Sequence, residues 1–171
     1  MNSRTESSVG LASDNDLRIA LHYEDAAKIL YNSNAYQDEI VLPTLFLIRQ
    51  YLELILKHNI NKLNEISSCN NLINKLNTAH RLVKIHEAFI EHYENVKSIK
   101  NITDTGDESH LNNLKNLITE ISKFDSDSQG FRYSKNKRGE KIIGREELFN
   151  LKNTFCLLDK VSDFLNSIEE M

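Results

Sequence analysis

The chain has 171 residues, 40% of them hydrophobic, and a formal net charge of -4 at pH 7. This length suits one compact domain that buries a core without metals or disulfides. The net negative charge excludes a protein that coats nucleic acid by bulk electrostatics. A single proline and five glycines supply little turn chemistry for a many-stranded fold, so helices are favoured.

The cysteines and the hydropathy bear on the cellular compartment of the protein. Cys69 and Cys156 are far apart and form no Cys-x-x-Cys pair, so the sequence suggests neither a zinc knuckle nor a dithiol motif. No run approaches the ~20 apolar residues of a membrane span, and residues 1–10 lack the apolar core of a secretory signal. We therefore expect a cytoplasmic protein with no membrane partner.

The N-terminal residues are polar and aperiodic, which predicts a disordered tail over residues 1–12. A single domain is expected over residues 13–171. Ser13 and Asp16 resemble a helix N-cap, and apolar residues then recur at helical spacing. The first helix is therefore predicted at about 14–32.

The most apolar segment, residues 43–66, predicts a helix in the middle of a bundle. Pro43 suits the first turn of that helix or a kink in a longer one. Three more helices, each with an apolar stripe, are predicted at about 79–97, 107–123 and 145–168. Together these elements predict an all-α fold, a bundle of about five helices.

A short β-hairpin is predicted at about 130–144, before the last helix. Two short runs flank a Lys-Asn-Lys-Arg-Gly turn, with Gly139 where positive φ is needed. Basic and aromatic side chains gather in and beside this segment: Phe131, Arg132, Tyr133, Lys135, Lys137, Arg138, Lys141 and Arg145. They can hold phosphates and stack bases, or form a solvated turn whose charge protects an edge strand from pairing.

Arg49, Glu53 and Lys57 are spaced four residues apart in the most apolar helix. This spacing places them on one stripe of the helix. One interpretation is a structural set of ion pairs, because charged groups must pair when they are buried. The other is that Arg49 anchors an anion or a partner's polar group in a cleft.

Arg81 and His86 have four residues between them, a spacing that fits the Arg-x(4–6)-His motif of HEPN ribonucleases. In metal-independent RNA cleavage, a histidine moves a proton to or from a reacting oxygen while an arginine stabilises charge on the phosphate. The alternative is a core histidine, because His86 shares a stripe with Leu82 and Phe89. An ideal helix also places Arg81 ~140° away from His86.

Three strings, in chain order, resemble a group of bacterial HEPN-like helical proteins: LPTLFLIRQYLELILK (42–57), TAHRLVKIHEAF (78–89) and QGFRYSKNKRGEKI (129–142). The matching positions are Arg49, Glu53, Lys57, His80, Leu82, Phe131, Arg132 and Tyr133. Two positions depart from the family pattern. Arg81 replaces an acidic residue after His80, and Ser134 replaces a proline after Tyr133.

The resemblance implies an antiparallel up-and-down helical bundle. It also implies a domain that binds or cleaves RNA without metal, in a toxin or phage-defence context and as a homodimer. The catalytic residues would be His80, Arg49, Arg81 and His86, with Arg81 and His86 as the alternative acid–base pair. Substrate would be bound by Arg132, Tyr133, Lys135, Lys137, Arg138, Glu53 and Lys57. No metal or cofactor is expected. The alternative is a non-catalytic nucleotide-binding or protein-interaction module of a larger complex.

Overall fold

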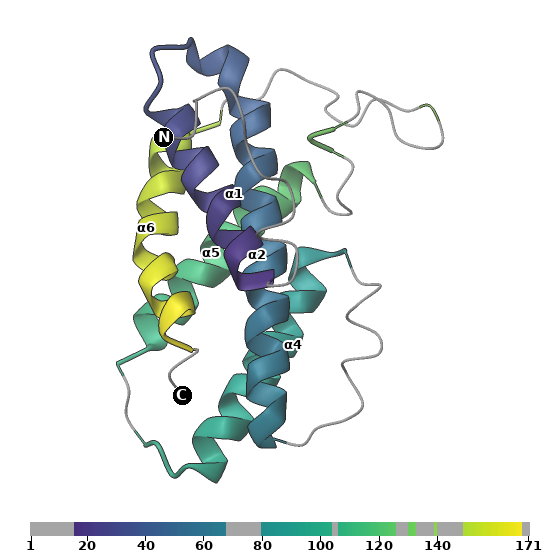
Figure 1. The fold of residues 1–171 in the computed structure, drawn as a ribbon, viewed down its shortest axis with the longest axis vertical. Helices are drawn as coiled ribbons and strands as arrows, with labels where there is room; N and C mark the ends of the chain where they lie inside the picture. Colours follow the sequence, from purple (N-terminus) through teal and green to yellow (C-terminus); the bar gives the residue numbers. More distant parts are fainter. Residues whose placement is uncertain are drawn as a thin grey trace, which may run out of the picture.

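The computed structural model describes residues 16–67, 80–103, 106–125, 130–132, 139 and 149–168. These residues form an all-helical bundle. Its helices are α1 (Asp16–Tyr31), α2 (Gln37–Ser67), α4 (Leu82–Ile99), α5 (Glu108–Phe124) and α6 (Leu151–Ser167). Figure 1 shows the long α2 at the centre, with α1 in front of it, α6 to the left and α5 crossing behind. In these ranges no helix has both the length and the apolar character needed to cross a membrane.

Helix α2 forms the centre of the core, as its apolar sequence predicted. Ile48, Leu52, Ile55 and Leu56 have no exposed surface. The helix begins at Gln37, earlier than the predicted start, and it continues through Pro43. A proline inside a helix removes one backbone hydrogen bond, and here the neighbouring turns keep the helix intact.

Helix α1 packs against both α2 and α6. The rings of Tyr31 and Phe155 stack with their centroids 4.0 Å apart. Glu24 is buried on the same face, where its carboxylate accepts hydrogen bonds of 2.6 Å from Ser162 Oγ and from Lys28 Nζ. These acceptor contacts allow a carboxylate to sit between two packed helices.

Helices α2 and α4 run in the same direction. His80, just before α4, contacts Glu53 in the middle of α2, while His92 of α4 contacts Ser67 at the end of α2. Residues later in α4 thus contact residues later in α2, which is the order expected for parallel helices. Helices α1 and α2 are antiparallel (Figure 1). The described helices therefore do not alternate in direction throughout, unlike the up-and-down order predicted from the sequence.

The β-hairpin predicted at 130–144 is not seen. Most of that segment lies outside the described residues, and the described part of the chain contains no strand. Residues 130–132 form a turn, and Gly139 has a φ of 80°, the positive φ expected there. The tail predicted at 1–12 also lies outside the described residues.

The last helix begins later than the predicted residue 145. Residues 149 and 150 are not helical, and α6 starts at Leu151. The side chain of Asn150 accepts a 3.0 Å hydrogen bond from the backbone N–H of Asn153. This contact satisfies one of the amide groups that a helix leaves free at its start, so Asn150 fixes the beginning of α6.

Candidate functional site

A buried polar cluster lies where the middle of α2 meets the start of α4 and the end of α5. We call it the Arg49 cluster, and it consists of Arg49, Glu53, Lys57, His80, Asp125 and Gly130. The four-residue spacing on α2 produces the predicted ion pairs. Glu53 Oε2 lies 2.8 Å from Arg49 Nη1, and Glu53 Oε1 lies 2.9 Å from Lys57 Nζ. Both carboxylate oxygens of Glu53 are therefore paired along the stripe, as the interpretation of the stripe as a set of ion pairs expects.

Arg49 is completely buried. Its guanidinium donates hydrogen bonds to Glu53 and to the backbone carbonyl of His80. Its Nε also forms an ion pair with Asp125, 3.2 Å from Oδ2. A permanently charged side chain needs such acceptors inside a protein. With no exposed surface, Arg49 does not reach a substrate in this structure, and it instead joins three segments of the chain.

Asp125 continues the cluster beyond α5. It directly follows the helix, and its Oδ1 accepts a 2.9 Å hydrogen bond from the backbone N–H of Gly130. A Cβ on Gly130 would lie 2.1 Å from the carbonyl oxygen of Phe124, so only glycine fits this approach. Phe131 then enters the core, with 8% of its surface exposed. Asp125 and Gly130 were not among the residues predicted for the site.

His80 is the part of the cluster that a ligand can reach. Its side chain is 61% exposed, and its Nδ1 lies 3.0 Å from Glu53 Oε1. Burial alone raises the pKa of Glu53, but hydrogen bonds from Lys57, Arg49 and His80 outweigh burial and hold the pKa below its ordinary value of 4.5. An ionised carboxylate only accepts, so Nδ1 carries the proton. In the neutral ring, Nε2 is then the nitrogen that can take up a proton.

The alternative pair, Arg81 and His86, is not brought together within the chain. Arg81 is exposed at the N-cap of α4. His86 is half-buried and lines a pocket of about 570 Å³ between α4 and α5, which Arg81 does not line. Burial and the nearby ammonium of Lys115 lower the pKa of His86. The angular separation on an ideal helix predicted this outcome.

The basic and aromatic segment is described only at its start. Arg132 is exposed and adjoins the buried Phe131. The other predicted substrate-binding residues of this segment lie outside the described residues: Tyr133, Lys135, Lys137 and Arg138. Lys57, predicted for the same role, is mostly buried and paired with Glu53.

The exposed face of His80 and the pocket at His86 each offer polar groups to a ligand. Among the residues that the structure describes, no three His, Cys, Asp or Glu side chains gather into a group that could hold a metal ion. Comparison of the chain with protein-family models, with curated proteins and with solved structures finds no match.

Proposed function

We propose that this chain is a HEPN-like helical domain that binds RNA and cleaves it without metal, with His80 as the acid–base group. The supporting observation is the 3.0 Å contact between Nδ1 of the exposed His80 and the carboxylate of Glu53. A carboxylate bonded to one ring nitrogen selects the tautomer, orients the ring and stabilises the imidazolium that forms during proton transfer.

In this proposal the 2′-hydroxyl of RNA attacks the adjacent phosphorus and the bond to the 5′-oxygen breaks. Nε2 of His80 takes the proton from the 2′-hydroxyl. Arg81, exposed directly after His80, provides a charge for the phosphate oxygens. A second acid must protonate the leaving 5′-oxygen. A symmetric homodimer supplies it as the protonated His80 of the other copy.

The test is cleavage of a labelled single-stranded RNA in the presence of EDTA. We expect His80→Gln to reduce the rate about 100-fold or more, the range for a general acid or base. His22→Gln is the matched control, since His22 is an exposed histidine on α1. Equal cleavage rates for the wild type and His80→Gln would contradict the proposal. Sedimentation at several protein concentrations tests the dimer.

The burial of Arg49 favours a second candidate, a non-catalytic nucleotide-binding or protein-interaction module. The guanidinium of Arg49 is buried and paired inside the protein, which leaves fewer cations for a transition state. Two measurements on the same RNA separate the candidates. Fluorescence anisotropy measures binding, and a denaturing gel then shows whether the RNA has been cut. Saturable binding with intact RNA supports the module, and products that disappear in His80→Gln support the nuclease.

A further inference from the structure

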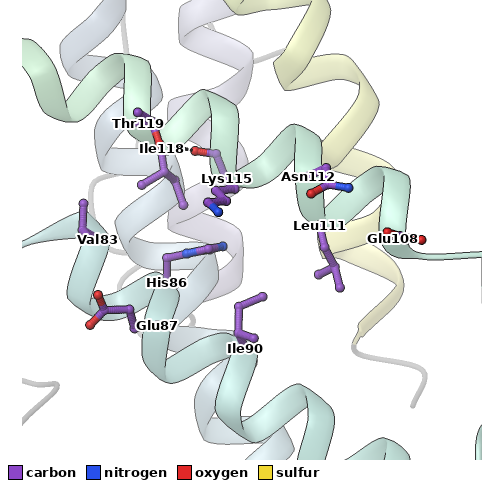
Figure 2. A pocket seen from close by; sticks show the side chains of 10 residues that line it. All are labelled: Val83, His86, Glu87, Ile90, Glu108, Leu111, Asn112, Lys115, Ile118 and Thr119. Atoms are coloured by element: carbon purple, nitrogen blue, oxygen red, sulfur yellow. Dashed lines mark hydrogen bonds between the residues drawn. The ribbon is translucent and has the colours of Figure 1, made fainter.

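The pocket between α4 and α5 has the size and lining of a small-molecule site. Its volume of about 570 Å³ falls within the range of roughly 300–1,000 Å³ for ligand pockets. Figure 2 shows apolar side chains from both helices around it, among them Val83 and Ile90 of α4 and Leu111 and Ile118 of α5. An apolar ligand body would therefore find apolar contacts on both sides.

Two polar groups enter this apolar space. Nε2 of His86 is buried and has no hydrogen-bond partner among the residues that the structure describes. Lys115 of α5 is exposed, and within the described ranges it forms no ion pair. Figure 2 shows its ammonium and the ring of His86 extending into the same space. A buried ring nitrogen without a partner costs free energy, so a ligand that bonds to it gains affinity.

The acidic residues of the pocket lie away from this point or are already paired. Glu87 forms a 2.7 Å ion pair with Lys84. Glu108 lies at the far end of the pocket in Figure 2, in the first turn of α5. Lys115 lies seven positions further along the helix, which is a rise of roughly 10 Å. The cation at the His86 end of the pocket is therefore Lys115, and the negative charge of Glu87 at that end is balanced by Lys84. Asn112, Thr119 and Glu108 add polar groups to the otherwise apolar lining.

We propose that this pocket binds a small amphipathic monoanion, with an apolar body and one carboxylate or sulfonate group. The body covers the apolar side chains of α4 and α5. The anionic group accepts hydrogen bonds from the Lys115 ammonium and from Nε2–H of His86. This site involves neither His80 nor Glu53, so it stands apart from the proposed RNA chemistry.

The probe is 1-anilinonaphthalene-8-sulfonate, which has an aromatic body, carries one sulfonate and fluoresces when it leaves water. We expect saturable binding of one probe per chain, displaced by decanoate and much less by decylamine. Lys115→Met should weaken binding about tenfold, as expected for a lost charge-assisted hydrogen bond. Lys123→Met is the matched control, since Lys123 is exposed on the same helix outside the pocket, and it should leave the Kd unchanged.

A second variant blocks the pocket from its exposed edge. Val83 is 43% exposed, so Val83→Trp can fill the opening without disturbing the core, and it should abolish saturable binding. Thermal melts of the variants establish that they are folded. The proposal is overturned by an absence of saturable probe binding in the wild type. It is also overturned if Lys115→Met binds as tightly as Lys123→Met, or if decylamine displaces the probe as well as decanoate does.

Discussion

Arg49 Nε lies 3.2 Å from Asp125 Oδ2, and neither side chain has any exposed surface. This ion pair ties the middle of α2 to the residue that follows α5. The same guanidinium bonds to the carbonyl of His80 at the start of α4. Three segments of the bundle therefore share one buried charge. Glu53 pairs with it from the same helix, while Asp125 and the carbonyl of His80 reach it only when the segments that carry them pack against α2.

Replacing Arg49 with methionine should destabilise the protein strongly. The variant keeps an apolar side chain of similar length but removes the guanidinium that pairs with the buried carboxylates of Asp125 and Glu53, and Glu53 keeps Lys57. We expect a loss of about 3–5 kcal/mol in the free energy of unfolding, the usual cost of breaking a buried pair. Urea unfolding followed by circular dichroism measures it. Arg81→Met, at an exposed position, is the control, and equal losses in the two variants would contradict the role assigned to Arg49.

Replacing Gly130 with alanine should separate the 130–132 turn from the end of α5. The added methyl group would meet the carbonyl oxygen of Phe124 and strain the hydrogen bond to Asp125. We expect a loss of about 1–3 kcal/mol, as for other cases of overpacking. Gly139→Asn is the control, because nothing lies within 4 Å of a Cβ there and asparagine tolerates positive φ. A Gly130→Ala variant as stable as this control would show that the close approach is dispensable.

The stability of the protein should depend on pH through the ionisation of Glu53. Its pKa in the folded state lies below the ordinary value of 4.5, so the unfolded chain binds the proton more readily. The stabilisation from Glu53 is thus fully present above about pH 4.5 and is lost as the pH falls through the lower folded-state pKa. Glu53→Gln removes this contribution. The difference in unfolding free energy between wild type and Glu53→Gln should shrink as the pH falls below 4.5.

Urea unfolding at pH 7, 5, 4 and 3 checks this expectation. Glu65→Gln serves as the matched control, because Glu65 is exposed on the same helix. That variant should follow the wild type at every pH. A constant difference between wild type and Glu53→Gln across the series would show that the ion pairs of Glu53 do not depend on its ionisation.

The helices were predictable because burial imposes a 3.6-residue pattern that the sequence displays. The Glu53 ion pairs were predictable for a related reason, since a four-residue spacing on one helix fixes neighbours locally. Asp125 could not be found in this way. Its pairing with Arg49 joins residues far apart in the chain, and only the packing of the helices decides which distant carboxylate approaches a buried cation. One feature of the sequence pointed to a further partner for Arg49. Glu53 is shared with Lys57, so a buried arginine on this stripe needs a second acidic residue.

The start of the last helix was predicted less accurately than the position of the central helix. The apolar stripe of the last helix extends upstream of Leu151 in the sequence, whereas the helix starts where Asn150 caps it. A side chain that bonds to the backbone can override a continuing apolar stripe. The spacing of Arg81 and His86 fits the Arg-x(4–6)-His motif. Helix geometry, however, already implied that the two side chains point in different directions.

His80 is attached to α2 at two independent points. Its ring contacts Glu53, and its backbone carbonyl accepts a hydrogen bond from Arg49. The main chain at this position is therefore anchored without help from the imidazole. Breaking the contact between the imidazole and Glu53 would leave the entrance to α4 bonded to Arg49. The ring and the backbone of this residue are therefore held by two different partners.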